Sequence, residues 1–514
     1  MSLGTASAGA PGLPRHPGLI SGSMMLASLL YSMDWTIAAV ALPHMQGAFS
    51  ATQDQIAWVI TSYIVASAIM IPTAGFLSTR FGRKRLCLFA VTGFTGASLL
   101  CGAADTLTGA VLARIAQGMC GAFIIPLSHA IILDTYPPEQ HGKAMAMWGT
   151  GSVFGSAIGP IVGGYVTEYM SWRWIYYINI PLGTLALLGV MSVVPETKRD
   201  PTRRLDWFGF LSLAVGLGSL QMMLDRGQRL DWFDSGEIVI EAGLAALGLY
   251  LFVVHTVTAR EPFLDPRLIS RRSFALALIL ISCYGLLSVP PLVMMPPFLE
   301  GMRGYMIDDV GLLQAPRGIG MLLALVVSGR ITGKVDPRLL IGGGLIALAA
   351  VNWEMSQWTA EVGQWPIVWT GLVQGAGAGI MLVPVQVIAF PSLPASQRTE
   401  GAAVFNTVRS VCSSLGVSIA LAVFVAQSAA MHSRLVEHVS PFREAVGDAG
   451  FEVGTVEGLA RLEHEIAFQA AMAGYNAAFL YLAVAAIAVL PILLFIGRVP
   501  GSRAPQRREQ VVME

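Results

Sequence analysis

Long apolar runs separated by short polar stretches fill this sequence from about residue 19 to residue 496. A helix that crosses a hydrocarbon core of about 30 Å needs roughly 20 apolar residues. Fourteen runs reach that length: Leu19–Pro43, Ile56–Leu77, Leu86–Ala103, Leu107–Leu133, Lys143–Thr167, Trp174–Val194, Trp207–Leu224, Gly236–Val257, Phe274–Leu299, Asp309–Gly329, Leu339–Trp358, Pro366–Phe390, Gly401–Ala426 and Ala470–Ile496. The pattern therefore predicts an all-α polytopic membrane protein with 14 transmembrane helices.

The polar segment Gly75–Arg85, between the second and third runs, is a short turn that carries four cations. Lys and Arg are enriched in cytoplasmic loops of membrane proteins. The loops on the side of this turn, together with both tails, hold 22 of the 32 Lys and Arg residues, and the opposite loops hold 7. Since an even number of spans places both ends of the chain on one side, both termini are predicted to be cytoplasmic.

The composition agrees with a membrane protein, because 54% of the residues are hydrophobic and only 12% are charged. Soluble domains carry about 25% charged residues. The formal net charge is zero, so no overall field favours binding to nucleic acid. The five cysteines lie in apolar stretches without metal-ligand spacing and are expected to be small core residues.

Motifs for chemical catalysis are not found in the sequence. It contains no nucleotide-binding loop, no metal-ligand cluster and no nucleophile elbow. ATP-driven pumping by this chain alone is therefore excluded, and neither a cofactor nor a metal is expected. Transport driven by an ion gradient is the remaining possibility.

The segments outside the spans are predicted as follows. Residues 1–18 form a disordered cytoplasmic tail and residues 497–514 a cytoplasmic C-terminal tail. Residues 427–469 form a long outward-facing loop, in which apolar side chains from Val456 to Ile466 recur at helical spacing. Two interpretations stay open for this loop: a helix that lies on the membrane surface, or a docking surface for an extracytoplasmic partner.

Three arginines lie inside the apolar runs, Arg114, Arg317 and Arg409, and Asp34 is the acidic residue placed deepest in a run. Glu241 and Glu354 lie near the outward ends of their runs, where they can reach the membrane surface. An ionisable side chain at membrane depth is costly, so it usually faces a bundle interior or an aqueous cavity and has a function. Asp34 is either a proton-binding group or one partner of a structural salt bridge. Arg114 needs an acceptor, and both a coupling role and a structural pair with Asp34 are compatible with its position.

The fifth run has a glycine every four residues, at Gly151, Gly155, Gly159 and Gly163. Such a stripe lets two helices approach closely. Pro160 lies within the stripe and removes a backbone donor, and Gly164 follows it. Static packing explains any single pair of these glycines, whereas four in register with a proline favour an interface that rocks or slides.

These motifs together resemble the major facilitator superfamily and, more narrowly, its fourteen-span drug:proton antiporters of the EmrB/QacA type. Gly75–Arg85 is similar to the superfamily's loop between spans two and three, and Gly155–Gly164 resembles the fifth-span signature of antiporters. Further segments that look like this branch are Asp34–Pro43, Arg114–Gly118, Trp172–Gly183, Ala315–Gly318 and Asn406–Arg409. The resemblance covers about residues 20 to 497.

The resemblance implies two six-helix bundles, residues 19–194 and 274–496, with two inserted helices in residues 195–273. It implies alternating access, in which the two halves rock around a central cavity. Asp34 would bind protons or cationic drugs and Arg114 would take part in proton coupling. Residues that could line the cavity, or simply bond between helices, are Gln117, Gln374, Gln386, Asn406 and Arg409. The family also implies a bacterial inner membrane, with a periplasmic adaptor and an outer-membrane channel as possible partners.

The basic loop departs from the family pattern at one position. The family usually has an acid before the first Arg of this loop, where this chain has Thr79. The conformational loop, made of Gly75, Thr79, Arg80, Gly82, Arg83 and Lys84, would therefore need a counter-charge from elsewhere. Asp134, at the cytoplasmic end of the fourth span, is one possibility.

The leading hypothesis for function is proton-coupled efflux of hydrophobic or amphipathic compounds, with membrane lipid as the surroundings. In that hypothesis the fifth-span glycines form the moving interface and the basic loop gates the cytoplasmic side. An alternative is proton-coupled export of one endogenous metabolite, siderophore or lipid. A remote alternative is a membrane scaffold or sensor that does not transport.

Overall fold

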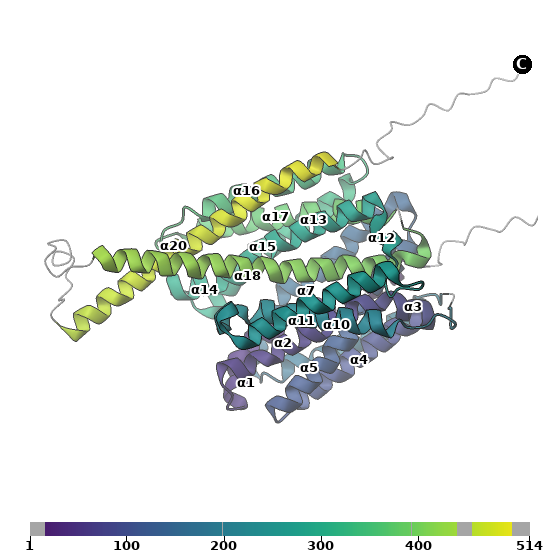
Figure 1. The fold of residues 1–514 in the computed structure, drawn as a ribbon, viewed down its shortest axis with the longest axis horizontal. Coiled ribbons are helices and arrows are strands. Elements are labelled where there is room, and N and C mark those ends of the chain that lie inside the picture. The colour runs from purple at the N-terminus through teal and green to yellow at the C-terminus, as the bar shows by residue number, and fades with distance from the viewer. Residues whose placement is uncertain (1–15, 198, 392, 439–454, 496–514) are drawn as a thin grey trace, which may run out of the picture.

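The computed structural model describes residues 16–197, 199–391, 393–438 and 455–495, and nearly all of them are helical (Figure 1). The first half contains α1 (Pro17–Ala48), α2 (Gln53–Met70), α3 (Ala74–Phe81), α4 (Arg83–Ala103), α5 (Leu107–Gly121), α6 (Ile124–Thr135), α7 (His141–Tyr169), α8 (Trp174–Tyr177) and α9 (Asn179–Val193). Two inserted helices follow, α10 (Trp207–Arg226) and α11 (Gly236–Thr258). The second half contains α12 (Pro266–Ser270), α13 (Arg272–Ser288), α14 (Pro290–Pro297), α15 (Ile307–Ile331), α16 (Pro337–Met355), α17 (Gln364–Ala389), α18 (Arg398–His438) and α20 (Val456–Val489).

Short helical turns join or extend these helices. They are η1 (Ile71–Thr73), η2 (Pro138–Gln140), η3 (Gly227–Leu230), η4 (Trp232–Asp234), η5 (Phe298–Met302), η6 (Ala395–Gln397) and η7 (Leu490–Phe495). Several spans consist of more than one helix: α2 continues through η1 into α3, α5 into α6, α8 into α9, and α13 through α14 into η5. Prolines Pro72 and Pro290 lie at two of these breaks, where their missing N–H interrupts the helical hydrogen bonds.

The number of spans agrees with the prediction from the sequence. Thirteen helical stretches in the described part of the chain are long and apolar enough to cross a membrane. The fourteenth is α7, whose 29 residues extend about 43 Å at 1.5 Å per residue. The many glycines of α7 lower its mean hydropathy, so α7 is not among the thirteen stretches. Its length is the evidence that it crosses the membrane. The all-α polytopic fold with 14 spans is confirmed.

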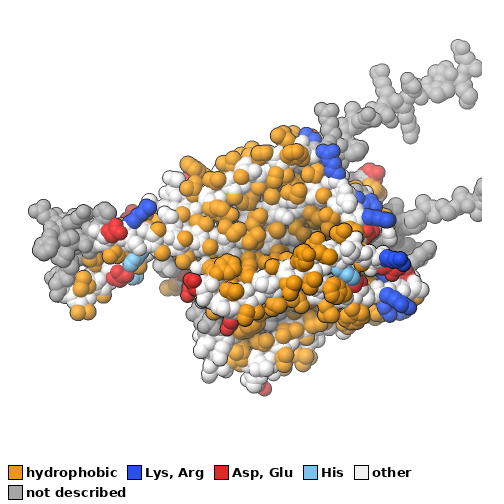
Figure 2. All heavy atoms as spheres, viewed as in Figure 1, with side chains coloured by type: hydrophobic (Ala, Val, Ile, Leu, Met, Phe, Trp, Pro, Cys, Tyr) orange, Lys and Arg blue, Asp and Glu red, His pale blue; other side chains and the backbone are white. Residues whose placement is uncertain are grey.

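The surface of the molecule matches a membrane protein. Figure 2 shows hydrophobic side chains over the middle of the visible face, with Lys and Arg gathered mainly at one end. The same end contains α3 and α12 in Figure 1. It is called the basic end below. The predicted C-terminal tail, residues 497–514, and residues 1–15 of the predicted N-terminal tail, residues 1–18, lie outside the described residues. Pro17 and Gly18, the last residues of that predicted N-terminal tail, belong to α1.

The inserted helices lie at the seam between the two halves. α10 packs on α2 of the first half and on α18 of the second half. Gln221 on α10 donates to Ser414 Oγ at 2.7 Å, and Ser418 Oγ donates to the Leu224 carbonyl at 2.7 Å. α11 packs on α10 where Gly216 and Gly248 meet, and much of its other face is exposed. The insertion therefore connects both halves through α10.

The glycine stripe of α7 packs against α1, within the first half. A Cβ atom at Gly155 would lie 2.5 Å from the Leu29 carbonyl oxygen, and one at Gly163 would lie 2.7 Å from the Ile37 side chain. Gly151 and Gly159 meet α1 in the same way, whereas Gly164 has open space around it. The four glycines of the stripe therefore lie at a contact inside the first half, and their role as a moving interface stays a prediction.

A different face of α7 meets the second half. Gly142 lies against Thr332, the residue directly after α15, and Gly149 lies against Leu325 of α15. Gly329 and Gly318 of α15 contact Ala146 and Ala157 of α7. Small residues again allow close approach, but they alternate with larger ones and come from both helices. The contact of α7 with α15 is therefore one of those that join the two halves.

The long loop between the last two spans is shorter than predicted. α18 continues to His438, and α20 begins at Val456 and runs without a break into the last span. Residues 439–454 lie outside the described residues. The amphipathic segment Val456–Ile466 is therefore an extension of the last transmembrane helix and does not form a separate helix on the membrane surface, which corrects that interpretation.

Candidate functional site

Asp34 lies near the middle of α1 and has no exposed surface. Three other helices bring polar side chains to it: Arg114 and Gln117 from α5, Asn179 from the start of α9, and Ser98 from α4. Arg114 and Gln117 are three residues apart, so they project from the same face of α5. We call these five residues the Asp34 cluster.

Both oxygens of Asp34 accept hydrogen bonds. Arg114 Nη1 donates to Oδ2 at 2.8 Å, and Gln117 Nε2 donates to Oδ1 at 2.8 Å. Asn179 Nδ2 donates to Oδ1 at 2.6 Å. Three donors, one of them charged, are the surroundings that stabilise an ionised carboxylate.

Arg114 is fixed by several contacts besides Asp34. Its Nε donates to the Val59 carbonyl at 3.1 Å, and its Nη1 donates to Gln117 Oε1 at 2.7 Å. The guanidinium carbon lies 4.2 Å from the centre of the Tyr63 ring, which is a cation–π contact. A fully buried ion pair is tolerated only with such additional partners, because both charges have lost their hydration.

Protonation of Asp34 would change this arrangement. A neutral carboxyl group carries an O–H, which must face an acceptor, whereas every partner of Asp34 within hydrogen-bond distance is an N–H donor. Binding a proton therefore weakens the charge-assisted bond from Arg114 and leaves the new O–H without an acceptor until a neighbouring side chain moves. Because the hydrogen bonds of Asp34 join α1, α5 and α9, the packing of the first half depends on the protonation of Asp34.

A second cluster of charges lies at the basic end, around Asp134 at the end of α6. Asp134 forms ion pairs with Arg83 of α4 and, at 2.6 Å, with Arg398 at the start of α18. Arg83 also donates to Thr399 Oγ1 at 2.8 Å and to the Ala395 carbonyl at 2.5 Å. Arg83 and Asp134 belong to the first half and the other three residues to the second. Asp134 thus supplies the counter-charge that the basic loop needs, and the Asp134 contacts hold the two halves together.

The remaining residues of the basic loop have different positions. Gly75 is in close contact with Glu400 of α18, because a Cβ atom at position 75 would lie 2.7 Å from the Glu400 Cβ. Gly82 has φ +88°, a left-handed conformation that glycine adopts without strain, and it separates α3 from α4. Lys84 donates to the Met191 carbonyl at 2.7 Å and Arg80 to the Arg203 carbonyl at 3.3 Å.

Thr79 occupies the position where the family usually has an acid. Its hydroxyl donates to the Gly75 carbonyl at 2.9 Å and accepts from Arg203 Nη1 at 3.2 Å. Arg203 also lies 3.6 Å from the carboxylate of Glu400. Arg203 thus connects Thr79 of the first half to a carboxylate of the second half.

The residues predicted to line a cavity separate into three groups. Gln117 belongs to the Asp34 cluster. Gln386 and Asn406 lie 3.4 and 3.3 Å from the two ring nitrogens of His129 on α6, in the buried contact between the halves. Gln374 lines a small cavity beside Arg317, and Arg409, half-buried on α18, donates to Asn406 at 3.3 Å.

The sequence analysis did not identify Asn179, Ser98, His129 or Glu400. Asn179 lies in the segment Trp172–Gly183, which resembles the family pattern. Its polar side chain in an apolar run could therefore have identified it as a candidate site residue. His129 and Ser98 are single polar residues in apolar runs, and their spacing does not distinguish a functional group from a packed one. Within the described residues no group of three or more His, Cys, Asp or Glu could hold a metal ion.

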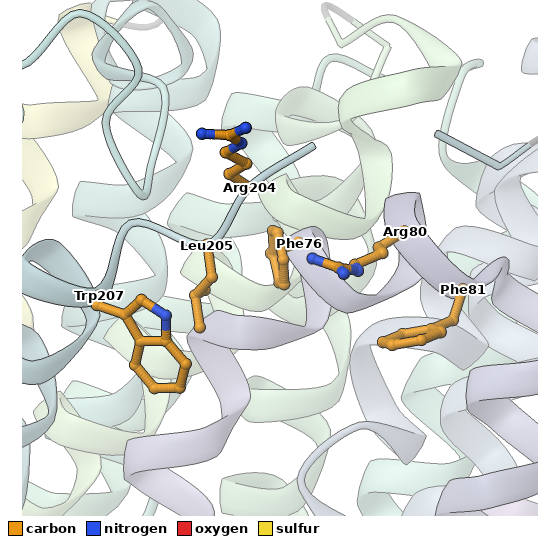
Figure 3. A pocket seen from close by; sticks show the side chains of 6 residues that line it. All are labelled: Phe76, Arg80, Phe81, Arg204, Leu205 and Trp207. Carbon is orange, nitrogen blue, oxygen red and sulfur yellow. The ribbon is translucent and has the colours of Figure 1, made fainter. Parts of the chain in front are cut away.

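A hollow of about 490 Å³ lies beside α3 at the basic end (Figure 3). Phe76, Leu205, Trp207 and Phe81 surround it, and Arg80 extends toward Phe76 above it. Trp207 and Phe81 are both largely exposed, so this is a hollow of the outer surface, and it does not reach the Asp34 cluster.

Comparisons with known proteins agree on the family. The family model described as "Major Facilitator Superfamily" matches residues 24–417. The multidrug export protein EmrB of Haemophilus influenzae is 33% identical over 431 residues, which cover 82% of this chain and 84% of that protein. The fatty acid resistance protein FarB of Neisseria gonorrhoeae is 32% identical over 480 residues, covering 92% of this chain and 94% of that protein.

Solved structures show the same fold at low sequence identity. A double Trp mutant of XylE aligns with a TM-score of 0.64 at 12% identity, over 95% of this chain and 97% of that one. The human organic anion transporter MFSD10 aligns with a TM-score of 0.61 at 14% identity, over 93% of this chain and 99% of that one.

Proposed function

Because the chain belongs to the major facilitator superfamily, in its EmrB-type branch of drug:proton antiporters, we propose that it exports hydrophobic and amphipathic compounds in exchange for protons. It is a multi-pass membrane protein and a secondary transporter, not an enzyme. We place it in the bacterial inner membrane, with both termini in the cytoplasm as the Lys and Arg distribution predicts.

The observation that carries this proposal is the Asp34 cluster. A carboxylate without exposed surface, held by three donors within a membrane-spanning bundle, is the kind of group that a proton gradient can act on. Its protonation removes a negative charge and adds an O–H that its present partners, all N–H donors, do not accept. The proton therefore changes the packing of α1, and packing is what an alternating-access transporter has to change.

The contacts of α1 support a route from Asp34 to the second half. Met33 and Thr36, which flank Asp34, are the residues of α1 that contact Gly159 on α7. A displacement of α1 at Asp34 therefore also displaces α7. The other face of α7 packs on α15, so the movement continues to the contact between the halves.

The described state is closed at the basic end. Asp134, Arg83, Thr399 and Arg398 join the halves there, and Gly75 is in close contact with Glu400. In alternating access, these contacts break when the basic end opens to admit a substrate. The basic loop would thus act as a gate, with Asp134 as its counter-charge.

A periplasmic adaptor is proposed as a partner of the end opposite the basic end. α18 has 41 residues and extends about 62 Å at 1.5 Å per residue, about twice the thickness of the hydrocarbon core. α20 has 34 residues and extends past the membrane beside it. These two extensions offer a helical surface to a protein outside the bilayer.

The test is transport in proteoliposomes under an imposed pH gradient, with a fluorescent lipophilic compound as substrate. Asp34→Asn keeps the size and most hydrogen bonds of the side chain but cannot bind the proton. We expect this variant to lose accumulation driven by the gradient and to retain exchange of substrate across the membrane at equilibrium.

Glu354→Gln is the matched control, because Glu354 is an exposed carboxylate on a transmembrane helix and has no hydrogen-bond partner within the described residues. Accumulation by this variant should equal that of the wild type. If Asp34→Asn accumulates substrate at the wild-type rate, Asp34 does not couple transport to protons. If the wild type itself shows no response to the gradient, the proposed function is wrong.

A further inference from the structure

The second half contains two arginines at membrane depth, Arg317 on α15 and Arg409 on α18. Arg317 donates to the Ser288 carbonyl and Arg409 to Asn406 Oδ1. Neither forms an ion pair with any carboxylate in the described part of the chain. Their positive charges are therefore balanced by neutral dipoles alone, which is costly at this depth.

The two guanidinium groups act on one region of the interior. Arg317 donates to the Ser288 carbonyl of α13, and Gly285, three residues earlier on α13, lies against the Arg409 carbonyl. Asp34, the fully buried carboxylate of the first half, is already paired with Arg114. The charges at this depth therefore sum to a positive interior, which repels a cationic molecule and attracts an anionic one.

Arg317 lines a small cavity of about 20 Å³ between α14, α15 and α17. The polar lining is Arg317, Gln314 and Gln374, and the apolar lining includes Met295, Leu313 and Ile367. Arg317 Nε is buried and has no hydrogen-bond partner among the described residues. This charged donor can therefore bond a ligand that enters the cavity.

The backbone holds Arg317 in place. Gly375 on α17 lies directly against the Arg317 carbonyl, and Gly371 lies one turn away beside its Cβ. No side chain other than hydrogen fits between α15 and α17 at Gly375. The backbone of Arg317 is therefore fixed between two packed helices, which gives its side chain a rigid base.

We propose that Arg317, with the amides of Gln314 and Gln374, binds the carboxylate of amphipathic organic anions, while the neighbouring apolar side chains accommodate the tail. This inference rests on the proposed export function and names its substrate class. The planar guanidinium of arginine matches a carboxylate with two parallel hydrogen bonds. In the described state the cavity holds a group about the size of one water molecule, so the subsite widens when the transporter changes conformation.

The experiment compares three probes of equal chain length: a fluorescent long-chain carboxylate, its methyl ester and the corresponding primary amine. Each is tested in proteoliposomes under the same pH gradient. We expect wild-type protein to transport the carboxylate with a KM about tenfold lower than that of the ester, the size of one lost charge-assisted hydrogen bond, and to transport the amine least.

Arg317→Gln should bring the KM values of carboxylate and ester together by raising the first and leaving the second unchanged. Arg317→Lys keeps the charge without the planar fork and should retain part of the preference. Arg330→Gln is the control, because Arg330 is an exposed cation on the same helix, and it should not alter the preference. Unchanged transport of the ester by Arg317→Gln shows that this variant is folded.

The outcomes separate the two proposals. If none of the three probes responds to the pH gradient, the proposed function fails. If the wild type transports the amine or the ester as well as the carboxylate, or if Arg317→Gln retains the preference, the anion subsite is wrong and proton-coupled export stands. If Arg317→Gln does not fold, the anion subsite is still tested by the order of the three KM values in the wild type and by the preference of Arg317→Lys.

Discussion

In the first half, Arg114 lies 2.8 Å from Asp34, donates to Gln117 and Val59, and stacks on Tyr63. In the second half, Arg317 and Arg409 lie at comparable depth with no carboxylate partner in the described part of the chain. The two halves share a fold but differ in how they compensate an intramembrane charge. In the first half, the carboxylate of Asp34 balances the charge of Arg114, and a proton on Asp34 can disrupt this ion pair. In the second half no carboxylate of the described residues balances the arginines, so they can bind an anionic ligand.

This difference assigns separate roles to the halves. A neutral pair responds to a proton without attracting charged substrates, because its charges cancel. A lone guanidinium does the reverse, since it has no ionisable partner whose protonation could switch it. The contrast predicts different responses to substitution in the two halves.

The largest effect is expected at the Asp34 cluster. Asp34→Ala leaves Arg114 buried without its counter-charge, and loss of one partner of a buried pair costs about 3–5 kcal/mol. Arg317→Gln removes a charge that has no partner and should change the free energy of unfolding by less than about 1 kcal/mol. Denaturation in detergent measures both. Equal losses in the two variants would contradict the contrast, and Asp34→Ala combined with Arg114→Gln should recover part of the stability.

The next effect is expected where the halves meet, at Asp134. Hydrogen bonds to charged groups contribute about 1.5–3 kcal/mol, and Asp134 is partly exposed, so its loss should favour the state open at the basic end by roughly tenfold. Distances between spin labels at Phe81 and Lys334 report that opening. Asp134→Asn should increase the population with long distances. Glu139→Gln, an exposed acid at the same end, is the control and should leave the distances unchanged.

A smaller effect, with opposite signs at two sites, is expected in the first half. Gly155→Ala places a Cβ atom 2.5 Å from the Leu29 carbonyl oxygen, so α1 and α7 must separate, at a cost of about 1–3 kcal/mol. Gly164 has open space, so Gly164→Ala should stabilise the helix by up to about 1 kcal/mol. Thermal unfolding of the two variants separates these outcomes. Equal midpoints would mean that α1 and α7 do not pack as closely as described.

The smallest effect is expected at Thr79. Thr79→Asp restores the acid that the family usually has, beside Arg203, but Glu400 already lies 3.6 Å from that arginine. Pairs at this partly exposed site contribute about 0–1 kcal/mol, so transport and stability should change little. Thr79→Asn is the uncharged control. A large gain in transport rate for Thr79→Asp alone would show that Asp134 does not replace the missing acid.

The sequence predicted the spans because each requires a long apolar run, and this signal is local. It also offered Asp34 and helix-end carbonyls as acceptors for Arg114, because a buried guanidinium needs a partner, and Asp34 is the one that the structure places beside it. The face of the glycine stripe could not be predicted, because periodicity shows that a stripe exists and not which of two neighbouring helices it meets. Asn179 and His129 were missed for a related reason: their partners lie in other helices, and only the packing of those helices gives a lone polar residue its role.

The position of α10 has a mechanical consequence. This helix packs on α2 in one half and is bonded through Gln221 and Leu224 to Ser414 and Ser418 in the other. When the halves rock, α10 cannot follow both of them rigidly, so these two hydrogen bonds stretch or exchange partners. The inserted helix therefore limits the relative motion of the two halves. The halves can move only as far as these two hydrogen bonds can stretch before they break.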